Sequence, residues 1–488
     1  MIGRVALVAL ALWARVAPAA GPPRVHLSVS DLILPRDDDM GINGQAQRAV
    51  LAAFRARHPD IEVVRFGGIS IQNIGIDVGP LIAIAAGIAP AVLYVNFRKS
   101  DSYIQQGFLA PLDPYVATMP RTELEETVPG PVREVLHRPG PDGHAHWWAL
   151  PYGHLVMALT WRKDLFQEAG LDPERAPRNW DELLDYARRI TNPAKGIYGM
   201  GFGSGPDASW HFYSFLLSAG ARAVAQDANG QWRAAFDSPE ATEAAYFYSR
   251  IIQQKYVKNG RTIPGAALRD PDIYTMWDQG KLGMFQDYLD NKLISQVNPE
   301  LIGIAPVPLG PSGKRGSEVN STCMGLSAGT KDPAVRQAAW EFMRFWCGPE
   351  AVRLRTRVFI ENGFGRFLNP VYLRKFGFTE YLKHVPKGWE AVFNQAMRDG
   401  GWFIGEIGKK FTINKVGVDL SNRMDAYSRL QELEGQTKPS KMGAEAMRLI
   451  AQYGDRTRLE TVNAIALTAG FKALDATDQE KVTRAIMD

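Results

Sequence analysis

The apolar and polar positions near the start of the chain predict a strand, a helix and a second strand. Residues 25–31 alternate apolar with polar side chains, as a strand with one buried face does. The segment 43–58 carries its apolar side chains on one helical face, with Asn43 as the expected N-cap, and the segment 61–66 is again extended. This order predicts a parallel βαβ unit within a buried sheet.

Later segments repeat this combination of short strands and well-bounded helices. The apolar run 91–95 predicts a strand that ends in polar residues. Asn179 and Glu182 have the spacing of a capping box, in which Asn179 accepts from the first turn of a helix and Glu182 reaches back. Further helices are expected after Asp332 and from Trp389 onward. Alternating strands and helices favour an α/β fold.

The first twenty residues have the pattern of a secretory signal. Arg4 gives a short basic region, residues 5–14 are apolar, and small residues at 17–20 provide a cleavage site. The apolar stretch is too short to span a bilayer, and no cysteine follows it to carry a lipid. We therefore expect a periplasmic protein that is exported by a cleavable signal peptide and is not a lipoprotein.

Composition narrows the class of protein further. A chain of 488 residues with 45% hydrophobic content predicts two or three domains. The formal charge of +4 includes Arg4 and Arg15 and falls to +2 without them, which gives no reason to expect a nucleic-acid partner. Cys323 and Cys347 are the only cysteines, and they either pair or remain two separate buried thiols.

A search for catalytic and metal-binding patterns finds little. The sequence contains neither a His-Glu-x-x-His motif nor a Cys-x-x-Cys motif. His144 and His146 alternate as two metal ligands on a strand would, but no third ligand is suitably spaced, so no metal and no cofactor are expected. Asp287 and Asp290 have the residue type of a glycosidase pair, yet binding of ligand hydroxyl groups uses the same side chains without turnover. We therefore expect no enzyme.

Several ordered segments resemble the extracellular solute-binding proteins of the maltose-binding type (family 1). The segments that carry the resemblance are AGIAPAVL at 86–93, YIQQGFLAPLD at 103–113, ALP at 149–151, WRKDLF at 161–166, AGL at 169–171, NWDEL at 179–183, WDQGKLGM at 277–284, GIAPVP at 303–308 and AAWEF at 338–342. Each motif is weak alone, but their order and spacing are specific. The sequence departs from the family pattern at Ala91, at Trp161-Arg162 and at Asp290, which leaves the identity of the ligand open.

The resemblance implies an α/β, two-lobed periplasmic-binding-protein fold (type II). In this fold each lobe is a mixed, mostly parallel sheet flanked by helices, and a hinge joins the lobes. The implied boundaries are a signal peptide at 1–20, an N-lobe at 21–151 plus 305–350, a C-lobe at 152–304 plus 351–455, and a C-terminal helical extension at 456–488.

The resemblance also implies a function. The protein would bind a mono- or oligosaccharide between its lobes and deliver it to the permease subunits of an ABC importer, most simply as a monomer. Two alternatives remain: the same fold binding a polyamine or a polyol phosphate, and a secreted carbohydrate-active enzyme. The expected ligand-binding residues are Trp210, Asp287, Asp290, Asn96, Arg98, His154, Asp31 and Trp402.

Trp210 is the strongest single candidate, because an aromatic face stacks on the C–H faces of a sugar ring. We predict that a sugar which binds the protein raises its melting temperature, since the sugar stabilises only the folded state. The substitution Trp210→Ala is expected to abolish that shift while the unliganded melting temperature changes little. Thermal unfolding with and without sugar measures both quantities, and an unchanged shift would exclude Trp210 from the site.

Overall fold

The computed structural model describes residues 24–66, 83–84, 88–97, 100–203, 207–222, 224–226, 228, 232–234, 238–270, 272–289 and 297–399. The expected signal peptide, the extension 456–488, and the predicted site residues Arg98, Asp290 and Trp402 lie outside these residues. Within them, no helix is both long and apolar enough to cross a membrane.

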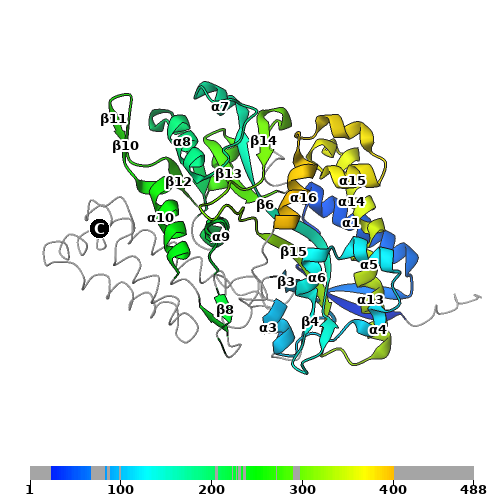
Figure 1. Ribbon diagram of the computed structural model, residues 1–488. Coiled ribbons are helices and arrows are strands. Elements are labelled where there is room, and N and C mark those ends of the chain that lie inside the picture. Colours follow the sequence, from blue (N-terminus) through cyan, green and yellow to red (C-terminus); the bar gives the residue numbers. More distant parts are fainter. Residues whose placement is uncertain are drawn as a thin grey trace, which may run out of the picture.

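A nine-stranded mixed sheet runs through the molecule (Figure 1) in the order β12-β7-β13-β6-β15-β3-β1-β2, with β14 also paired to β6. Its strands are β1 Val25–Ser30, β2 Ile61–Phe66, β3 Val92–Asn96, β6 Leu150–Arg162, β7 Tyr198–Phe202, β12 Ala267–Arg269, β13 Leu282–Tyr288, β14 Ile302–Ala305 and β15 Val319–Leu326. Three hairpins stand apart: β4 His137–Pro139 with β5 Ala145–Trp147, β8 Val224–Gln226 with β9 Trp232–Ala234, and β10 Tyr256–Lys258 with β11 Arg261–Ile263.

The helices divide between the two ends of this sheet. They are α1 Ile42–Arg57, α3 Ser100–Gln105, α4 Asp113–Val116, α5 Arg121–Thr127, α6 Gly130–Leu136, α7 Lys163–Glu168, α8 Trp180–Ile190, α9 Asp207–Ala219, α10 Pro239–Gln253, α11 Ile273–Asp278, α13 Pro333–Cys347, α14 Pro349–Glu361, α15 Pro370–Lys375 and α16 Trp389–Asp399. In Figure 1, α8, α9 and α10 lie in the left half, and α1, α13 and α14 lie in the right half.

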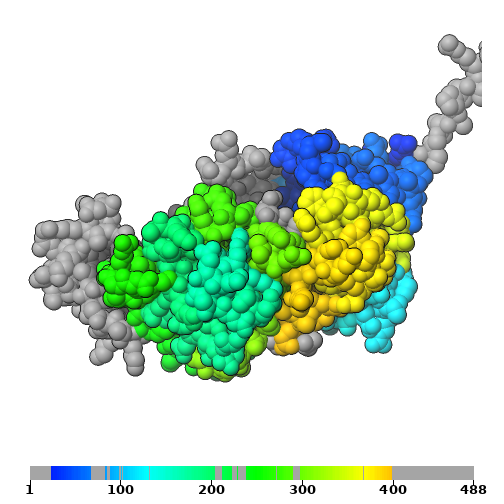
Figure 2. Space-filling model, turned by 90° about the horizontal axis from the view of Figure 1, so that it is seen from above, coloured from blue at the N-terminus to red at the C-terminus, as the bar shows by residue number. Residues whose placement is uncertain are grey.

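Strand β6 belongs to both halves. Its residues up to Val156 pair with β15, and its residues from Met157 onward pair with β13 and β14. A single continuous strand therefore joins the half that contains α1 to the half that contains α8. Figure 2 shows helices α14 to α16, in yellow and orange, lying over the half that contains α1 and bordering the other half.

The predicted βαβ unit is confirmed, with one correction at its helix. Strands β1 and β2 are parallel and pair from Val25 with Ile61 onward. Helix α1 begins at Ile42 after Gly41, so the prediction of Asn43 as N-cap was wrong. The carboxylate of Asp39 accepts from the Gly41 backbone N–H at 2.9 Å, and the helix begins two residues earlier than the sequence pattern predicts.

The lobe boundaries expected from the sequence stay a prediction, and the packing of α14 is relevant to them. Helix α14 packs mainly on α1, and it also contacts α13 and α5. These three helices come from segments that the expected boundaries place in the N-lobe, whereas α14 itself falls in the segment 351–455 expected in the C-lobe.

The two cysteines are separate buried thiols, the second of the two alternatives. Cys323 lies in β15 and Cys347 ends α13, and neither is disulfide-bonded. Burial raises the pKa of the Cys323 thiol to about 12. Neither thiol is therefore poised to act as a nucleophile at neutral pH.

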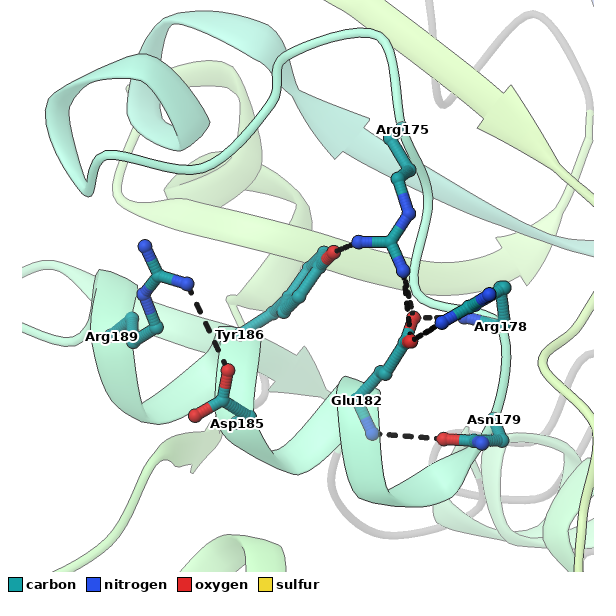
Figure 3. A network of polar contacts seen from close by, with 7 residues as sticks. All are labelled: Arg175, Arg178, Asn179, Glu182, Asp185, Tyr186 and Arg189. Carbon is teal, nitrogen blue, oxygen red and sulfur yellow. Dashed lines mark hydrogen bonds and ion pairs between the residues drawn. The ribbon is translucent and has the colours of Figure 1, made fainter.

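A polar network holds the start of α8, as Figure 3 shows. The side chain of Asn179 accepts from the Glu182 backbone N–H at 3.0 Å, which confirms the predicted cap. Glu182 reaches back to the Arg178 backbone N–H at 3.0 Å and also binds the guanidinium groups of Arg175 and Arg178. These bonds lower the pKa of Glu182 to about 2, and the hydrogen bond to the Arg178 side chain contributes most.

We predict that Glu182→Gln destabilises the protein by about 1 kcal/mol near neutral pH, because it removes charge-assisted hydrogen bonds on a partly exposed surface. The folded-state pKa of Glu182 is depressed, so its contribution is complete above the unfolded value of 4.5 and is lost as pH falls toward about 2. Urea unfolding of wild type and variant at several pH values measures this difference. Asp185→Asn, an exposed carboxylate on the same helix, is the control with little expected effect. If the difference in free energy of unfolding between wild type and Glu182→Gln stayed constant down to the lowest pH, the role given to the Glu182 carboxylate would be contradicted.

Candidate functional site

A row of polar side chains crosses one face of the central sheet. In β15, Thr322 pairs with Asn96 of β3 on one side and with Gly153 of β6 on the other. Directly paired residues point to the same face, so Asn96 and Thr322 lie side by side. Gly153 makes room for them, because a Cβ atom there would lie 2.6 Å from the Thr322 hydroxyl oxygen.

The row continues into the other half of the sheet. Asn320 lies two residues before Thr322 and therefore on the same face, and its amide donates to the Tyr288 hydroxyl at 3.3 Å. Tyr288, at the end of β13, in turn donates to the carboxylate of Glu318 at 2.8 Å. We call Asn96, Glu318, Asn320, Thr322 and Tyr288 the polar row. All except the buried Glu318 are partly exposed.

Asp31 lies at the same end of the sheet as Asn96. It directly follows β1, and Asn96 ends the neighbouring parallel strand β3. The Asp31 backbone N–H donates to the Phe66 carbonyl at 3.2 Å, which ties the ends of β1 and β2 together. Ligands of open α/β sheets bind at such carboxyl ends, so the positions of Asp31 and Asn96 are compatible with one site.

His154 lies on the opposite face from Asn96. It pairs with Ser321, whose side chain points away from those of Asn320 and Thr322, and the two side chains approach to 3.4 Å. His154 lines a separate cavity of about 600 Å³ behind β6. Desolvation in this position lowers the pKa of His154 to about 4, so the ring is neutral at neutral pH. The structure does not bring His154 together with the polar row.

The carboxylate of Asp287 is bonded within the protein. The residue is only 3% exposed, the Tyr274 hydroxyl donates to one of its oxygens, and the Tyr288 backbone N–H donates to the other at 2.7 Å. His211 of α9 lies 3.8 Å from the same carboxylate. Asp287 thus anchors α9 and α11 to β13. Its expected role as a direct ligand contact remains a prediction.

Trp210 is described only by its backbone position, and several residues of the polar row were not predicted. Trp210 lies in the first turn of α9, one residue before His211, but its side chain is outside the described part of the structure. The sequence interpretation missed Glu318, Asn320, Thr322 and Tyr288. Part of a signal was present, because Glu318, Asn320 and Thr322 have the two-residue spacing of one strand face, although the polar Ser321 interrupts the alternation.

The alternating histidines do not form a metal site within the described residues, where no group of three His, Cys, Asp or Glu side chains is placed to hold a metal ion. His146 instead lies between two carboxylates, with Nδ1 3.0 Å from Asp113 and Nε2 2.9 Å from Asp142. These bonds, with Asp142 contributing most, raise the pKa of His146. The ring joins the β4–β5 hairpin to α4.

Two α/β halves that share strands and present polar groups at their junction define a two-lobed binding protein of the type II periplasmic class. The chain belongs to the family of bacterial extracellular solute-binding proteins, whose model matches residues 39–353. This finding confirms the family resemblance and the predicted fold class.

Individual relatives are distant. A protein of Brucella abortus (strain 2308) that is named as a binding protein is 28% identical over 307 residues, which cover 61% of this chain and 68% of that protein. The sn-glycerol-3-phosphate-binding periplasmic protein UgpB of Escherichia coli (strain K12) is 27% identical over 148 residues, which cover 30% of this chain and 32% of that one.

Solved structures agree on the fold. Maltose-bound MalE3 of T. maritima has a TM-score of 0.60 and 19% identity, with 93% of this chain and 100% of that chain covered. An ABC transporter solute-binding protein of Thermotoga lettingae TMO, bound with α-D-tagatose, has a TM-score of 0.59 and 18% identity, with 91% and 100% covered. At these identities the structures establish the fold and not the ligand of this chain.

The carboxylates around His146 predict that its contribution to stability depends on pH. The folded-state pKa is raised above the unfolded value of 6.5, so the stabilisation is complete below that value and is lost as pH rises through the folded-state pKa. We expect His146→Gln to cost about 0.5–1 kcal/mol in mildly acidic buffer and little in alkaline buffer. Urea unfolding at both pH values measures this. His144→Gln, at the exposed neighbouring histidine, serves as control. A loss that grows with pH would contradict the prediction.

Proposed function

We propose that the protein is the periplasmic solute-binding component of an ABC importer, which binds a mono- or oligosaccharide between its lobes and delivers it unchanged to the permease subunits. It is exported by a cleavable signal peptide at residues 1–20 and acts as a monomer without metal or cofactor. Membership of the extracellular solute-binding family supports this proposal.

The polar row is the observation that carries the proposal. Its partly exposed members carry amide and hydroxyl groups, which together donate and accept the hydrogen bonds that sugar hydroxyl groups make. It also crosses the junction, because Asn96 lies on β3 in one half and Tyr288 lies on β13 in the other. A solute held along the row touches both halves, and lobe closure then needs further contacts that form only in the closed state.

Binding without turnover fits the chemistry of the described side chains. The buried carboxylate of Asp287 bonds to Tyr274 and to backbone, and that of Glu318 bonds to Tyr288, so both act within structural networks. A glycosidase needs one carboxyl group as acid and another as base or nucleophile on either side of the scissile bond. Because each of these carboxylates accepts a hydrogen bond from a tyrosine hydroxyl, a role in holding the structure together is favoured over acid–base catalysis.

A polyol phosphate is the second candidate solute. UgpB of Escherichia coli is named for binding sn-glycerol-3-phosphate, and UgpB of Mycobacterium tuberculosis, at a TM-score of 0.59 and 15% identity, was solved in complex with glycerophosphocholine. Arg98, two residues beyond Asn96, supplies the cation that a phosphate would require.

We predict that Asn320→Ala weakens binding of the cognate solute about 10- to 100-fold, the loss expected when one buried hydrogen-bonding partner is removed. The solute is first found by thermal unfolding with maltose, α-D-tagatose, ribitol, D-mannitol, sn-glycerol 3-phosphate and glycerophosphocholine, and its affinity is then measured by calorimetry. Asn362→Ala is the matched control, because Asn362 is exposed at the end of α14.

The outcomes separate the candidate functions. A sugar or polyol that binds and is recovered unchanged supports the proposal, and preference for the two phosphate esters supports the second candidate. Accumulation of a hydrolysis product would identify an enzyme instead. Equal affinities of Asn320→Ala and Asn362→Ala would exclude the polar row from the site.

A further inference from the structure

Positive charge is concentrated in two segments of the chain. Helix α1 contains three arginines and no acidic residue. The segment 349–390, from the first residue of α14 to the second residue of α16, contains eight lysines and arginines and four acidic residues. Together the two segments carry a net charge of +7, whereas the whole chain carries +4, so the remaining residues sum to −3. We call α1 and residues 349–390 the basic face.

These segments form one continuous surface. Helix α14 packs on α1 and contacts α15, and α15 in turn contacts α16 and the short helix η5 Thr379–His384. Figure 2 shows the blue segment that contains α1 beside the yellow segment that contains α14. The positive charge is therefore concentrated in space as well as in sequence.

Ion pairs neutralise only part of this charge. The pairs on the basic face are Arg57 with Glu350, Arg374 with Glu390, and Lys375 with Glu126 of α5. Among the residues that the structure describes, five exposed cations have no carboxylate within ion-pair distance: Arg55, Arg353, Arg357, Lys383 and Lys387. The exposed carboxylates of the face that lack such a pair are Glu361 and Glu380. An excess of exposed cations remains after pairing.

Two of these cations lie near a third. Lys383 and Lys387 line one open hollow together with Arg374. The acidic residue in the same lining, Glu390, is already bonded to Arg374 at 2.8 Å. Because like charges repel, an anionic partner beside this group lowers its electrostatic energy.

The distribution of the charge indicates the kind of partner. The cations are spread over several packed helices, which suits an extended anionic surface better than a single small anion. A bilayer that contains anionic phospholipids is such a surface and attracts exposed Lys and Arg side chains. The large apolar side chains that are exposed in the described structure lie outside the basic face: Leu32, Met40, Val64, Ile88 and Val257. Attraction by this face is therefore electrostatic and involves no inserted apolar side chain.

We propose that the basic face binds the anionic phospholipid surface of a bilayer by electrostatic attraction. This interaction is separate from solute binding between the lobes and goes beyond the proposed function. It holds the protein at the membrane in which the permease subunits of the proposed importer lie.

The test measures co-sedimentation with vesicles of phosphatidylcholine alone and of phosphatidylcholine mixed with phosphatidylglycerol. The chain from residue 21 onward is used, because the apolar segment 5–14 would enter vesicles by itself. We expect binding to be at least 10-fold tighter on the anionic vesicles at about 0.01 M salt, where the Debye length is about 30 Å. Binding is expected to disappear at about 1 M salt, where the Debye length is about 3 Å.

Two double variants locate the contact. Lys383→Gln with Lys387→Gln removes two unpaired cations of the basic face and is expected to weaken binding to the anionic vesicles about 5- to 30-fold. Lys281→Gln with Lys314→Gln removes the same charge at exposed positions outside the face and is expected to leave binding unchanged. All four side chains are exposed, so both variants are expected to keep the melting temperature of the wild type.

The proposal is overturned if the two kinds of vesicle bind equally, if the two double variants bind alike, or if binding persists at high salt. Release from the vesicles by millimolar inorganic phosphate would also overturn it, since that result identifies a site for a free anion. Tighter binding to double-stranded DNA than to the anionic vesicles would do the same. A chain that binds anionic vesicles but no sugar would refute the proposed function and not the role of the basic face.

Discussion

The organisation of the molecule depends on one strand that is shared by both halves. Strand β6 pairs with β15 up to Val156 and with β13 and β14 from Met157 onward, so its backbone hydrogen bonds hold the two halves in one sheet. Successive side chains of a strand point to opposite faces. Residues such as Leu155 therefore face the polar row, while His154 faces the cavity on the other side. This alternation places the polar row on one side of β6 and the cavity lined by His154 on the other.

The sequence predicts the elements better than it predicts which side chains meet. Helix caps and strand periods are local, so the cap at Asn179 and the parallel pair β1 and β2 could be anticipated. The N-cap of α1 could not, because it depends on the local turn that Asp39 makes with Gly41. Family motifs then supply the fold, since their order along the chain is specific even where each motif is weak.

The candidate site is less predictable because it depends on the register between distant strands. Asn320 and Thr322 look like ordinary polar strand residues until the pairing of β15 with β3 and β6 places them beside Asn96. The same register separates His154 from them, although the sequence interpretation placed His154 among the ligand-binding residues. A shift of one residue in either pairing would reverse both results.

A hinge at this junction gives the polar row and the more distant groups different roles. Displacement during lobe closure grows with distance from the hinge, and the bond between Asn320 and Tyr288 already joins the two halves at 3.3 Å. Groups this close to the hinge can bind a solute in open and closed states alike, so they contribute affinity but little preference between the states. Closure then requires contacts that exist only in the closed state, and these must come from groups farther out, such as Asp31 and the first turn of α9. The buried link between His211 and Asp287 fixes that turn on β13, which makes the position of α9 follow the motion of its half.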